Sequence, residues 1–524
     1  MVLHAQVCGR LGDRRHYSTK PTPARVGFSS SGRKLPVPSM HPQTPPHRSF
    51  GEDDSTVPTR RWVLYYSLVL VLSIVSDGWS GKPSPLLHQL LLLPLTWVTA
   101  VLLTKLLSPS VTDSGGRMSG RTGLPQWWWV ALVIFEGLSV TMMGAEGRHF
   151  RSFGYHLGFV PCLAAAVAIS IMWMVSARVQ RALSLFLAVM VTYAAGLLLA
   201  IRCFPLNYLR SDMLPVIAWA DGRLLAHLNP YATMHVGERL YDFPYLPGML
   251  IAFWPAAAAR VDLRVATLSY STAMAALIWR TACKERRFQV AALLGVFVLC
   301  PFLQYRHDLY LQPHWFLLVV AIVLMQRGQF LWSALVWGMS CAVYQLSWVL
   351  VPFVVLHAYR RGGLSEAAKA SVLIVSGGFA IAGPFLKAAF HRVSNNTVSQ
   401  WSRLPHALAD PMNFSYWLTY VVRPDQLKWI QAAVLTTMFM WCVARGRCGT
   451  LEDTLRWMIW ALAIFIPLNV IVDGYFYLTL LLLVLIYVCV ANGWWGDTDL
   501  GNAPGSLADG SGTRGTVLAS SRST

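Results

Sequence analysis

The chain has 524 residues, of which 55% are hydrophobic and 13% are charged. This balance excludes a soluble protein, because apolar side chains spread over many runs cannot all be buried in one core, and it indicates an integral membrane protein. The formal net charge of +19 does not indicate a nucleic-acid partner. Much of the Lys and Arg excess lies in the amino-terminal tail and in short loops, where it fits positive-inside topology and contact with anionic membrane lipids.

The two ends of the chain lack hydrophobic periodicity. Residues 1–59 are rich in Arg, Ser and Pro and are expected to form a disordered basic tail. Their composition also resembles an organelle transit peptide, although such compositions arise by chance as well. The first apolar run begins at Trp62, behind Arg60 and Arg61, and is expected to be a retained helix. Residues 496–524 are rich in Gly, Ser and Asp and are expected to be a disordered cytoplasmic tail.

Apolar runs fill the chain between the tails. They predict an all-α, polytopic membrane protein with about 12–14 transmembrane helices. Several runs are shorter than the roughly 20 residues of a perpendicular span, so tilted, broken or re-entrant segments are expected. Residues 60–181 are expected to carry additional N-terminal helices, and residues 182–495 the main transmembrane module. The runs lie at residues 62–77, 86–106, 127–143, 155–176, 182–202, 245–259, 265–280, 288–303, 312–326, 330–358, 366–387, 427–444, 455–472 and 474–493.

Lys and Arg residues near the run ends predict the orientation, because basic residues concentrate on the cytoplasmic side. If each run crosses the membrane in the opposite direction to the run before it, most basic clusters lie on one side of the membrane. That side is then assigned to the cytoplasm. The loops 203–244 and 388–426 are expected on the exoplasmic side. The clusters that agree are Arg60-Arg61, Lys105 with Arg117 and Arg121, Arg178 with Arg181, Arg360-Arg361, and Arg445 with Arg447.

Two features fit this alternating count poorly. The cluster Lys284–Arg287 is expected on the exoplasmic side, against the positive-inside rule, which indicates a re-entrant or miscounted helix nearby. The unusually polar turn at residues 304–314 is expected on the cytoplasmic side. That placement argues against a role for the turn in an exoplasmic site.

The longest polar insertion runs from Arg210 to Leu250. Residues 213–228 carry apolar side chains at helical spacing and predict a short helix on the membrane surface, which Asn229-Pro230 ends. Asp212 lies directly before this helix, where a carboxylate sits at the boundary of water and lipid. Asp212 also fits a purely structural role as the helix N-cap. The other acids of this region, Asp221 and Glu238, are expected to be solvated loop charges.

The residues around this helix resemble a known family. Asp212, the stretch 224–231 (LLAHLNPY) and the stretch 241–247 (YDFPYLP) resemble the GT-C glycosyltransferases, and among them the polyprenol-phosphate-sugar-dependent mannosyltransferases of the actinobacterial lipoglycan type. Those proteins show an acid, an amphipathic stretch ending in Gly-x-Asn-Pro-Tyr, and Tyr-x-Tyr-Pro-Pro opening the next helix. Here His227-Leu228 replaces Gly-x, and Tyr245-Leu246 separates the two prolines. The resemblance covers residues 205–255 well, residues 245–495 loosely, and the first four helices not at all.

The resemblance implies a GT-C-like fold, a polyprenyl-phosphate-linked sugar donor, most readily mannosyl, and a lipid or glycan acceptor. It also implies that Asp212 is the general base. A carboxylate within hydrogen-bond reach of an acceptor hydroxyl can take its proton as the glycosidic bond forms, which fits an inverting displacement. A lipid phosphate leaving group needs cations rather than a proton donor. The candidate cations are Arg210, Arg306, His307 and Arg403.

Further candidates for donor or acceptor binding come from polar residues between apolar runs. Asn229, Tyr231 and Tyr245 belong to the family-like motifs, although a structural role in the turn and at the helix start is equally in keeping with them. Gln345 interrupts the run 330–358, where it either lines a cavity or bonds to a neighbouring helix. The family often has Lys at this position. The remaining candidates are Asp308 and His314 in the polar turn, and Asn395 and Asn396 in the loop before Arg403.

No metal or other cofactor is expected. His307 and His314 with Asp308 lack a third strong ligand and the i,i+4 spacing of a helical metal site. The nine cysteines show no spacing typical of a zinc site or a disulfide framework, so they are expected to act as small buried hydrophobic residues.

Two other classes of protein remain open. A secondary transporter also has about a dozen helices, but usually shows internal repeats and charges at mid-membrane depth, which this sequence lacks. A non-catalytic protein of the same fold is the other alternative. In each case the chain is a multi-pass membrane protein, in the plasma membrane if the cell is bacterial and in the endoplasmic reticulum if it is eukaryotic.

Overall fold

The computed structural model describes the main transmembrane module and small parts of the preceding region. Both predicted tails, the runs 127–143 and 155–176, and Glu238 lie outside the described residues. The described residues are 61, 64–69, 71–72, 97–108, 181–203, 206, 213–236, 239–300, 303, 309–399, 408–409, 414–472 and 475–495.

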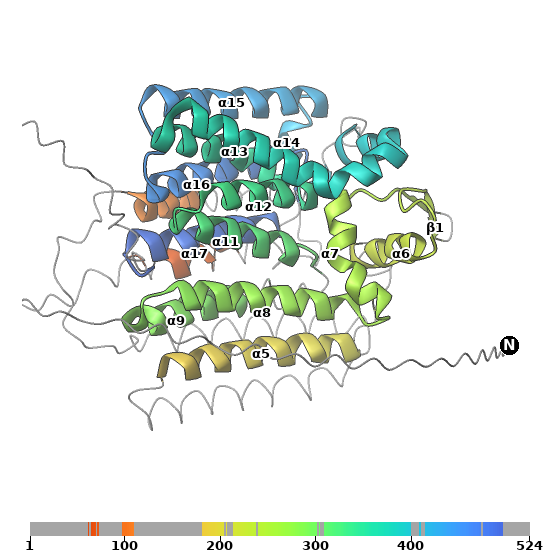
Figure 1. Ribbon diagram of the computed structural model, residues 1–524, viewed down its shortest axis with the longest axis horizontal. Coiled ribbons are helices and arrows are strands. Elements are labelled where there is room, and N and C mark those ends of the chain that lie inside the picture. The colour runs from red at the N-terminus through yellow and green to blue at the C-terminus, as the bar shows by residue number, and fades with distance from the viewer. Residues whose placement is uncertain are drawn as a thin grey trace, which may run out of the picture. The chain divides into compact units, whose positions relative to one another are not determined.

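The fold of the described residues is all-α, with strands of only two or three residues (Figure 1). The strands form one antiparallel hairpin, β1 with β2, and one parallel pair, β3 with β4. The helices are α5 (Arg181–Cys203), α6 (Met213–Leu225), α7 (Pro247–Ala258), α8 (Leu263–Thr281), α9 (Arg287–Val298), α11 (Gln312–Gln326), α12 (Phe330–Val343), α13 (Leu346–Ser394), α14 (Phe414–Leu418), α15 (Pro424–Ala444), α16 (Leu451–Leu468) and α17 (Phe476–Ala491), with the short turns η2 (Lys284–Arg286) and η3 (Asn395–Ser399). The strands are β1 (Met234–Val236), β2 (Arg239–Tyr241), β3 (Leu408–Ala409) and β4 (Ile471–Val472).

By length and composition, the described helices are compatible with an α-helical membrane protein. Three described helical segments are long and apolar enough to cross a membrane, namely Ala182–Arg202, Leu346–Thr397 and Pro424–Ala444. Their outward faces carry large apolar side chains, such as Phe379, 61% exposed, and Trp429, 77% exposed. Apolar surface of this extent is unfavourable in water and suits contact with lipid. The GT-C-like fold and the total number of spans stay predictions.

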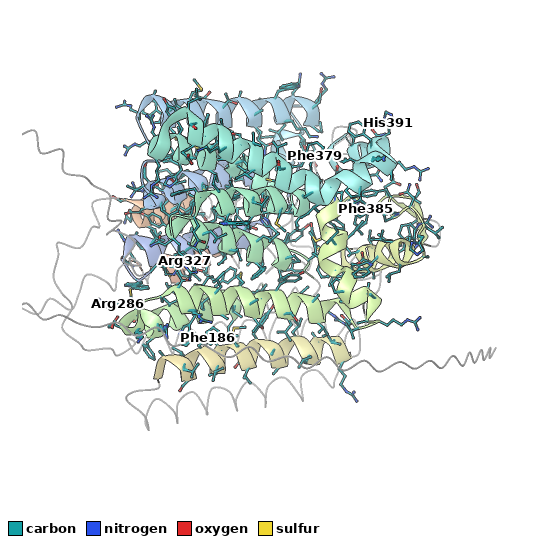
Figure 2. The ribbon with its side chains drawn as sticks, viewed as in Figure 1. Phe186, Arg286, Arg327, Phe379, Phe385 and His391 are labelled. Carbon is teal, nitrogen blue, oxygen red and sulfur yellow. The ribbon has the colours of Figure 1, made fainter. Side chains whose placement is uncertain are left out.

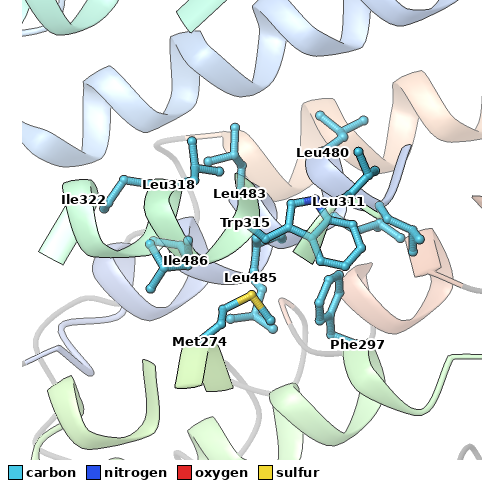
Figure 3. Packing of buried hydrophobic residues seen from close by; sticks show 14 of the residues in the cluster. Met274, Phe297, Leu311, Trp315, Leu318, Ile322, Leu480, Leu483, Leu485 and Ile486 are labelled. Atoms are coloured by element: carbon cyan, nitrogen blue, oxygen red, sulfur yellow. The ribbon is translucent and has the colours of Figure 1, made fainter. Parts of the chain in front are cut away.

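The centre of the bundle is α17, in which every side chain from Leu478 to Cys489 is buried. A helix that is apolar on all sides must be surrounded by other helices. Trp315 of α11 packs beside it with Phe297 of α9, and its indole Nε1 donates to Thr479 Oγ1 at 2.9 Å. Figure 3 shows this packing, with Met274 of α8 on the other side.

The run 330–358 folds as a helical hairpin. Its predicted break is confirmed, because α12 ends at Val343 and α13 begins at Leu346. The chain then reverses, since the Arg361 guanidinium lies 4.7 Å from the centre of the Phe330 ring, at the opposite end of both helices. A second break within α13, at Gly362-Gly363, explains why it contains two predicted runs. Gly363 has φ +71°, a conformation that favours glycine.

One end of the bundle gathers the basic residues. Figure 2 shows Arg286 and Arg327 at this end and His391 at the other. Two hydrogen bonds link helix ends there: Cys283 N–H donates to Trp494 O at 2.9 Å, and Arg360 Nη2 donates to Val443 O at 2.6 Å. We call this the basic end, and it holds Lys284, Arg286, Arg287, Arg327, Arg360, Arg361, Arg445 and Arg447. The alternating count, which set Lys284–Arg287 apart from the other clusters, was therefore wrong, as the disagreement of this cluster with the positive-inside rule had indicated.

The cause of this error is α7. The run 245–259 has the composition of a span, but Figure 1 shows α7 running across the neighbouring helices rather than along them. Both of its ends lie at the same end of the bundle. Gly248 packs against the backbone of Ala342, and Arg264, which follows α7, donates to Ala200 O at the end of α5. If this run is not counted as a span, the carboxyl end of α8 and the following Lys284–Arg287 cluster fall on the side of the other basic clusters.

The end opposite the basic end holds α6, α7 and the start of α11. We call it the aromatic end and define it by Tyr245, Tyr310, Tyr344 and Tyr475, which lie in contact there. Residues 309–314 lie at this end, beside α7. The expected cytoplasmic placement of the polar turn, on the side of the basic clusters, was therefore also wrong for these residues.

Candidate functional site at the aromatic end

The surface helix predicted at residues 213–228 is α6, and it ends slightly earlier, at Leu225. Two backbone bonds close its carboxyl end: His227 N–H donates to Leu224 O at 3.0 Å, and Leu228 N–H donates to Arg223 O at 2.8 Å. This is a Schellman motif, whose turn residue adopts a left-handed conformation that usually needs glycine. His227 takes that position with φ +57°.

The loop after α6 is held by its own polar side chains. Asn229 Oδ1 accepts from Tyr231 N–H at 2.9 Å, and the Tyr231 hydroxyl donates to Tyr245 O at 3.1 Å. Arg223 Nε donates to Asn229 O at 2.7 Å. Tyr231 packs edge-on against Phe243, and burial raises its pKa above the usual tyrosine value. These bonds give Asn229 and Tyr231 structural roles in shaping the loop.

Tyrosine side chains from separate segments meet beyond this loop. The Tyr245 ring lies 4.5 Å from the Tyr310 ring, measured between centroids. Tyr310 in turn contacts the Tyr344 ring at 6.0 Å, and its hydroxyl lies 3.3 Å from the Tyr475 hydroxyl. Phe476 stacks on Tyr475 at 4.8 Å. We call Tyr245, Tyr310, Tyr344 and Tyr475 the tyrosine cluster. Tyr245 is its most exposed member, and the other three are 3–5% exposed.

A buried polar group supports the tyrosine cluster from inside the bundle. His314, on the first turn of α11, places Nδ1 at 3.1 Å from Ser340 Oγ and 3.2 Å from Ser347 Oγ. The two hydroxyls lie 2.8 Å apart. The His314 ring is 5.2 Å from the Tyr344 ring. We call His314, Ser340 and Ser347 the His–Ser cluster, which fixes the reversal between α12 and α13 beside the tyrosines.

Gln345 and the asparagines after α13 lie near one another. Gln345 Nε2 donates to Thr397 O at 3.4 Å, so the expected bond to a neighbouring segment is observed. Asn396 is buried, whereas Asn395 is exposed. Thr397 Oγ1 donates to Val393 O at 2.6 Å, which continues the helical path of α13. The two loops are thus joined at the aromatic end.

The remaining candidates precede or follow described segments. Asp212 is bonded to Met213, the first residue of α6, and the stretch 304–308 comes directly before Leu309 and Tyr310. The candidates outside the described residues are Asp212, Arg210, Arg306, His307, Asp308 and Arg403. The structure therefore describes the neutral, aromatic half of the candidate site, and the acid and the cations stay predictions.

Sequence reasoning missed several residues of this end. Tyr310 lies in the polar turn before the run 312–326, Tyr344 interrupts the run 330–358, and Tyr475 stands at the start of the run 474–493. In such places they resemble membrane-interface tyrosines, so only their contacts identify them. Asp221 was expected to be solvated, but it is 0% exposed, and burial raises its pKa to about 8. A signal for its burial existed, because residues 214, 217 and 221 have the i, i+3, i+7 spacing of one helix face.

The arrangement combines broad aromatic faces with hydroxyl and amide groups at the end of a lipid-facing bundle. Aromatic faces accommodate apolar chains and the C–H faces of sugars, and hydroxyls exchange hydrogen bonds with sugar hydroxyls. Within the described ranges, no group of three His, Cys, Asp or Glu side chains is placed to hold a metal ion. No protein-family model, curated protein or solved structure matches this chain.

Proposed function

We propose that the chain is a membrane glycosyltransferase of GT-C type that works at the aromatic end. It transfers a hexose, most readily mannose, from a polyprenyl-phosphate-linked donor to a lipid or glycan acceptor. The observation that carries the proposal is the meeting of Tyr245, Tyr310 and His314 at one end of the bundle. The sequence marks Tyr245, His314 and the polar turn that contains Tyr310 in separate parts of the chain. The helix α6 begins at Met213, the residue after Asp212, and lies at the same end.

The proposed chemistry starts from Asp212. Its carboxylate takes the proton of the acceptor hydroxyl while the oxygen attacks the anomeric carbon of the sugar, and the lipid phosphate leaves from the opposite face. A general base in this role contributes roughly 10²–10⁴-fold to the rate. The departing phosphate carries its own negative charge, so Arg210, Arg306, His307 and Arg403 are proposed to stabilise it.

The described residues are proposed to position the sugar and the chain of the carrier. Tyr245, the most exposed member of the tyrosine cluster, is proposed to offer its ring face to the sugar and to the first isoprene units. Tyr310 and Tyr475 are buried behind it, and the contact between their hydroxyls at 3.3 Å is proposed to hold the Tyr245 ring in position. The His–Ser cluster keeps Tyr344 in place, because it fixes the helix reversal that presents this ring.

The orientation agrees with this proposal. Basic residues concentrate on the cytoplasmic side, so the basic end is assigned to the cytoplasm and the aromatic end to the exoplasmic face. A polyprenyl-phosphate sugar displayed on that face reaches the aromatic end from the lipid, and the acceptor reaches it from water. His227 adds support for the resemblance, because it occupies a left-handed turn where the family has glycine.

The test is a transfer assay on purified protein with radiolabelled polyprenyl-phosphate-mannose and a membrane extract as the acceptor source. We expect transfer by the wild type and at least a 100-fold loss in Asp212→Asn. The matched control is Asp242→Asn, an exposed acid of the same loop that accepts a bond from Thr233 Oγ1 at 2.8 Å. Near-normal transfer by Asp212→Asn would remove the general base and with it the proposed mechanism.

The rival function, secondary transport, is favoured by one observation. The His–Ser cluster is a buried polar group at a helix reversal, and transporters place binding groups at interrupted helices. A transporter would accumulate its substrate in proteoliposomes under an ion gradient without forming a glycosidic bond. Gradient-driven uptake by protein that lacks transferase activity would favour this rival over the glycosyltransferase.

A further inference from the structure

Asp221 is a buried acid on a helix that lies outside the predicted spans. It shares one face of α6 with Leu214 and Ile217, and all three side chains are 0% exposed. Within the part of the chain that the structure describes, neither carboxyl oxygen of Asp221 has a hydrogen-bond partner. A buried polar group without a partner costs stability, and a buried charge without a partner costs far more. The group therefore calls for an explanation beyond packing.

Among the described residues, the surroundings of Asp221 supply no compensating charge. The helix that packs most extensively against α6 is α7, whose sequence PGMLIAFWPAAA contains no titratable side chain. On α6 itself, the nearest cation in sequence is Arg223, which lies over the Trp219 ring and donates to Asn229 O. Burial alone therefore raises the pKa of Asp221 to about 8, from an ordinary value of 3.8.

We propose that Asp221 is a protonation site that controls the docking of α6 on α7. The neutral carboxylic acid is compatible with the apolar interface, so protonated Asp221 lets α6 dock. The ionised carboxylate must be hydrated, so loss of the proton favours release of the helix face that carries Leu214 and Ile217.

The direction of the pH dependence follows from the two protonation equilibria. The docked helix holds its proton up to pH about 8, whereas a released helix loses it near the ordinary value of 3.8. Docking is therefore strongest below the ordinary value and weakens as the pH rises towards about 8. Between these limits the ratio of released to docked helix rises about tenfold per pH unit, and above them it stays constant.

This site has a consequence for the transfer reaction that rests on the proposed function. Asp212 is bonded to Met213, the first residue of α6. Release of α6 would therefore also loosen the constraint on the proposed general base, which the chain joins directly to this helix. Protonation of Asp221 would keep the proposed general base at the site, and ionisation would let it move away.

The test measures docking directly and needs no substrate. Ile217→Cys places a thiol on the buried face, and Ala218→Cys places one on the exposed face of the same helix. Each full-length variant in nanodiscs is treated with a water-soluble maleimide at pH 6 and pH 8, and labelling of that cysteine is read by mass spectrometry. Dividing the labelling rate of Ile217→Cys by that of Ala218→Cys cancels the change in thiol ionisation with pH. We expect this ratio of labelling rates to rise at least tenfold between pH 6 and pH 8.

The decisive comparison adds Asp221→Asn, which resembles the protonated acid and cannot ionise. In that background the ratio should stay constant within about twofold over the same pH range, since the titrating group is gone. If Ile217→Cys fails to fold, Val216→Cys serves instead, because Val216 is 3% exposed. An equal rise with and without the substitution, or a constant ratio in both, overturns the proposal. Either outcome leaves the transfer assay on Asp212→Asn unaffected, so the two proposals fail separately.

Discussion

At the basic end, arginine side chains close the helix termini, whereas at the aromatic end tyrosines and short helices join separate loops. Arg360 caps the carbonyl of Val443, and Arg456 pairs with Glu452 at 2.8 Å. Opposite them, Tyr245, Tyr310 and Tyr475 form contacts between segments that are far apart in sequence. Charged side chains thus stabilise the helix termini at the basic end, and aromatic contacts connect the loops at the aromatic end.

This difference supports the proposal that the aromatic end is the working end. The connections at the basic end are short, such as residues 327–329 between α11 and α12, and leave little chain for a binding site. The aromatic end carries α6, α7 and the β1–β2 hairpin, which do not continue the bundle. Binding residues are commonly carried by such connecting segments on a rigid scaffold. Variants matched between the two ends should therefore differ in activity more than in stability.

The largest expected effects come from two buried histidines, one at each end. His314 contacts Ser340 and Ser347, and His357 places Nδ1 at 2.9 Å from Cys448 O. Replacing either by Ala leaves a cavity and buried polar groups without a partner, at a cost of about 2–4 kcal/mol. Thermal unfolding in detergent should show similar losses for both. Only His314→Ala should also lower transfer per folded molecule, and an equal loss in His357→Ala would contradict the assignment of the working end.

A smaller effect is expected from removing single tyrosine hydroxyls. Tyr310→Phe removes the contact with the Tyr475 hydroxyl, and Tyr487→Phe removes the contact with Glu452 and Arg456 at the basic end. Each should cost about 0.5–1.5 kcal/mol of stability. The transfer rate should fall about tenfold in Tyr310→Phe, because the ring that supports Tyr245 loses its anchor on Tyr475, and stay unchanged in Tyr487→Phe. A loss of transfer in Tyr487→Phe without a loss in Tyr310→Phe would contradict the assignment of the site to the aromatic end.

The smallest effects concern the helix-closing turns. His227→Gly at the aromatic end should raise stability by up to about 1 kcal/mol, because glycine adopts a positive φ without strain. Gly446→Ala at the basic end, where φ is +66°, should lower stability by about 1 kcal/mol. Thermal unfolding of both variants checks the pair. A destabilised His227→Gly would show that the imidazole makes a favourable contact worth more than the strain.

The amino-acid sequence predicts the helical segments well and their direction poorly. The runs 312–326 and 427–444 correspond to α11 and α15, because hydrophobic composition fixes which segments avoid water. The run 245–259 has the same composition, yet α7 crosses the end of the bundle. Hydrophobic composition does not determine whether a helix runs along the bundle or across its end. That orientation depends on contacts between residues distant in sequence, such as the contact between Gly248 and Ala342.

The candidate site was predictable only in part, for a related reason. Tyr245 and His314 stand in polar or family-like stretches, and the structure brings them to one end. Tyr344 and Tyr475 carry no local signal, because their importance lies in which rings they meet. Asp221 was misjudged because an acid in an amphipathic helix is usually solvated, and only its helix face shows otherwise.

The central claim is that the aromatic end binds the lipid-linked donor, and photo-crosslinking tests it most directly. A polyprenyl phosphate with a diazirine in its first isoprene unit is added to the protein in nanodiscs, irradiated and mapped by mass spectrometry, with and without excess unlabelled polyprenyl phosphate. We expect competed labelling in peptides that contain Tyr245, Tyr310, Tyr344 or Tyr475. Competed labelling at residues 327–329 or 445–450 instead, or uncompeted labelling spread over the outer faces of α13 and α15, would contradict the claim.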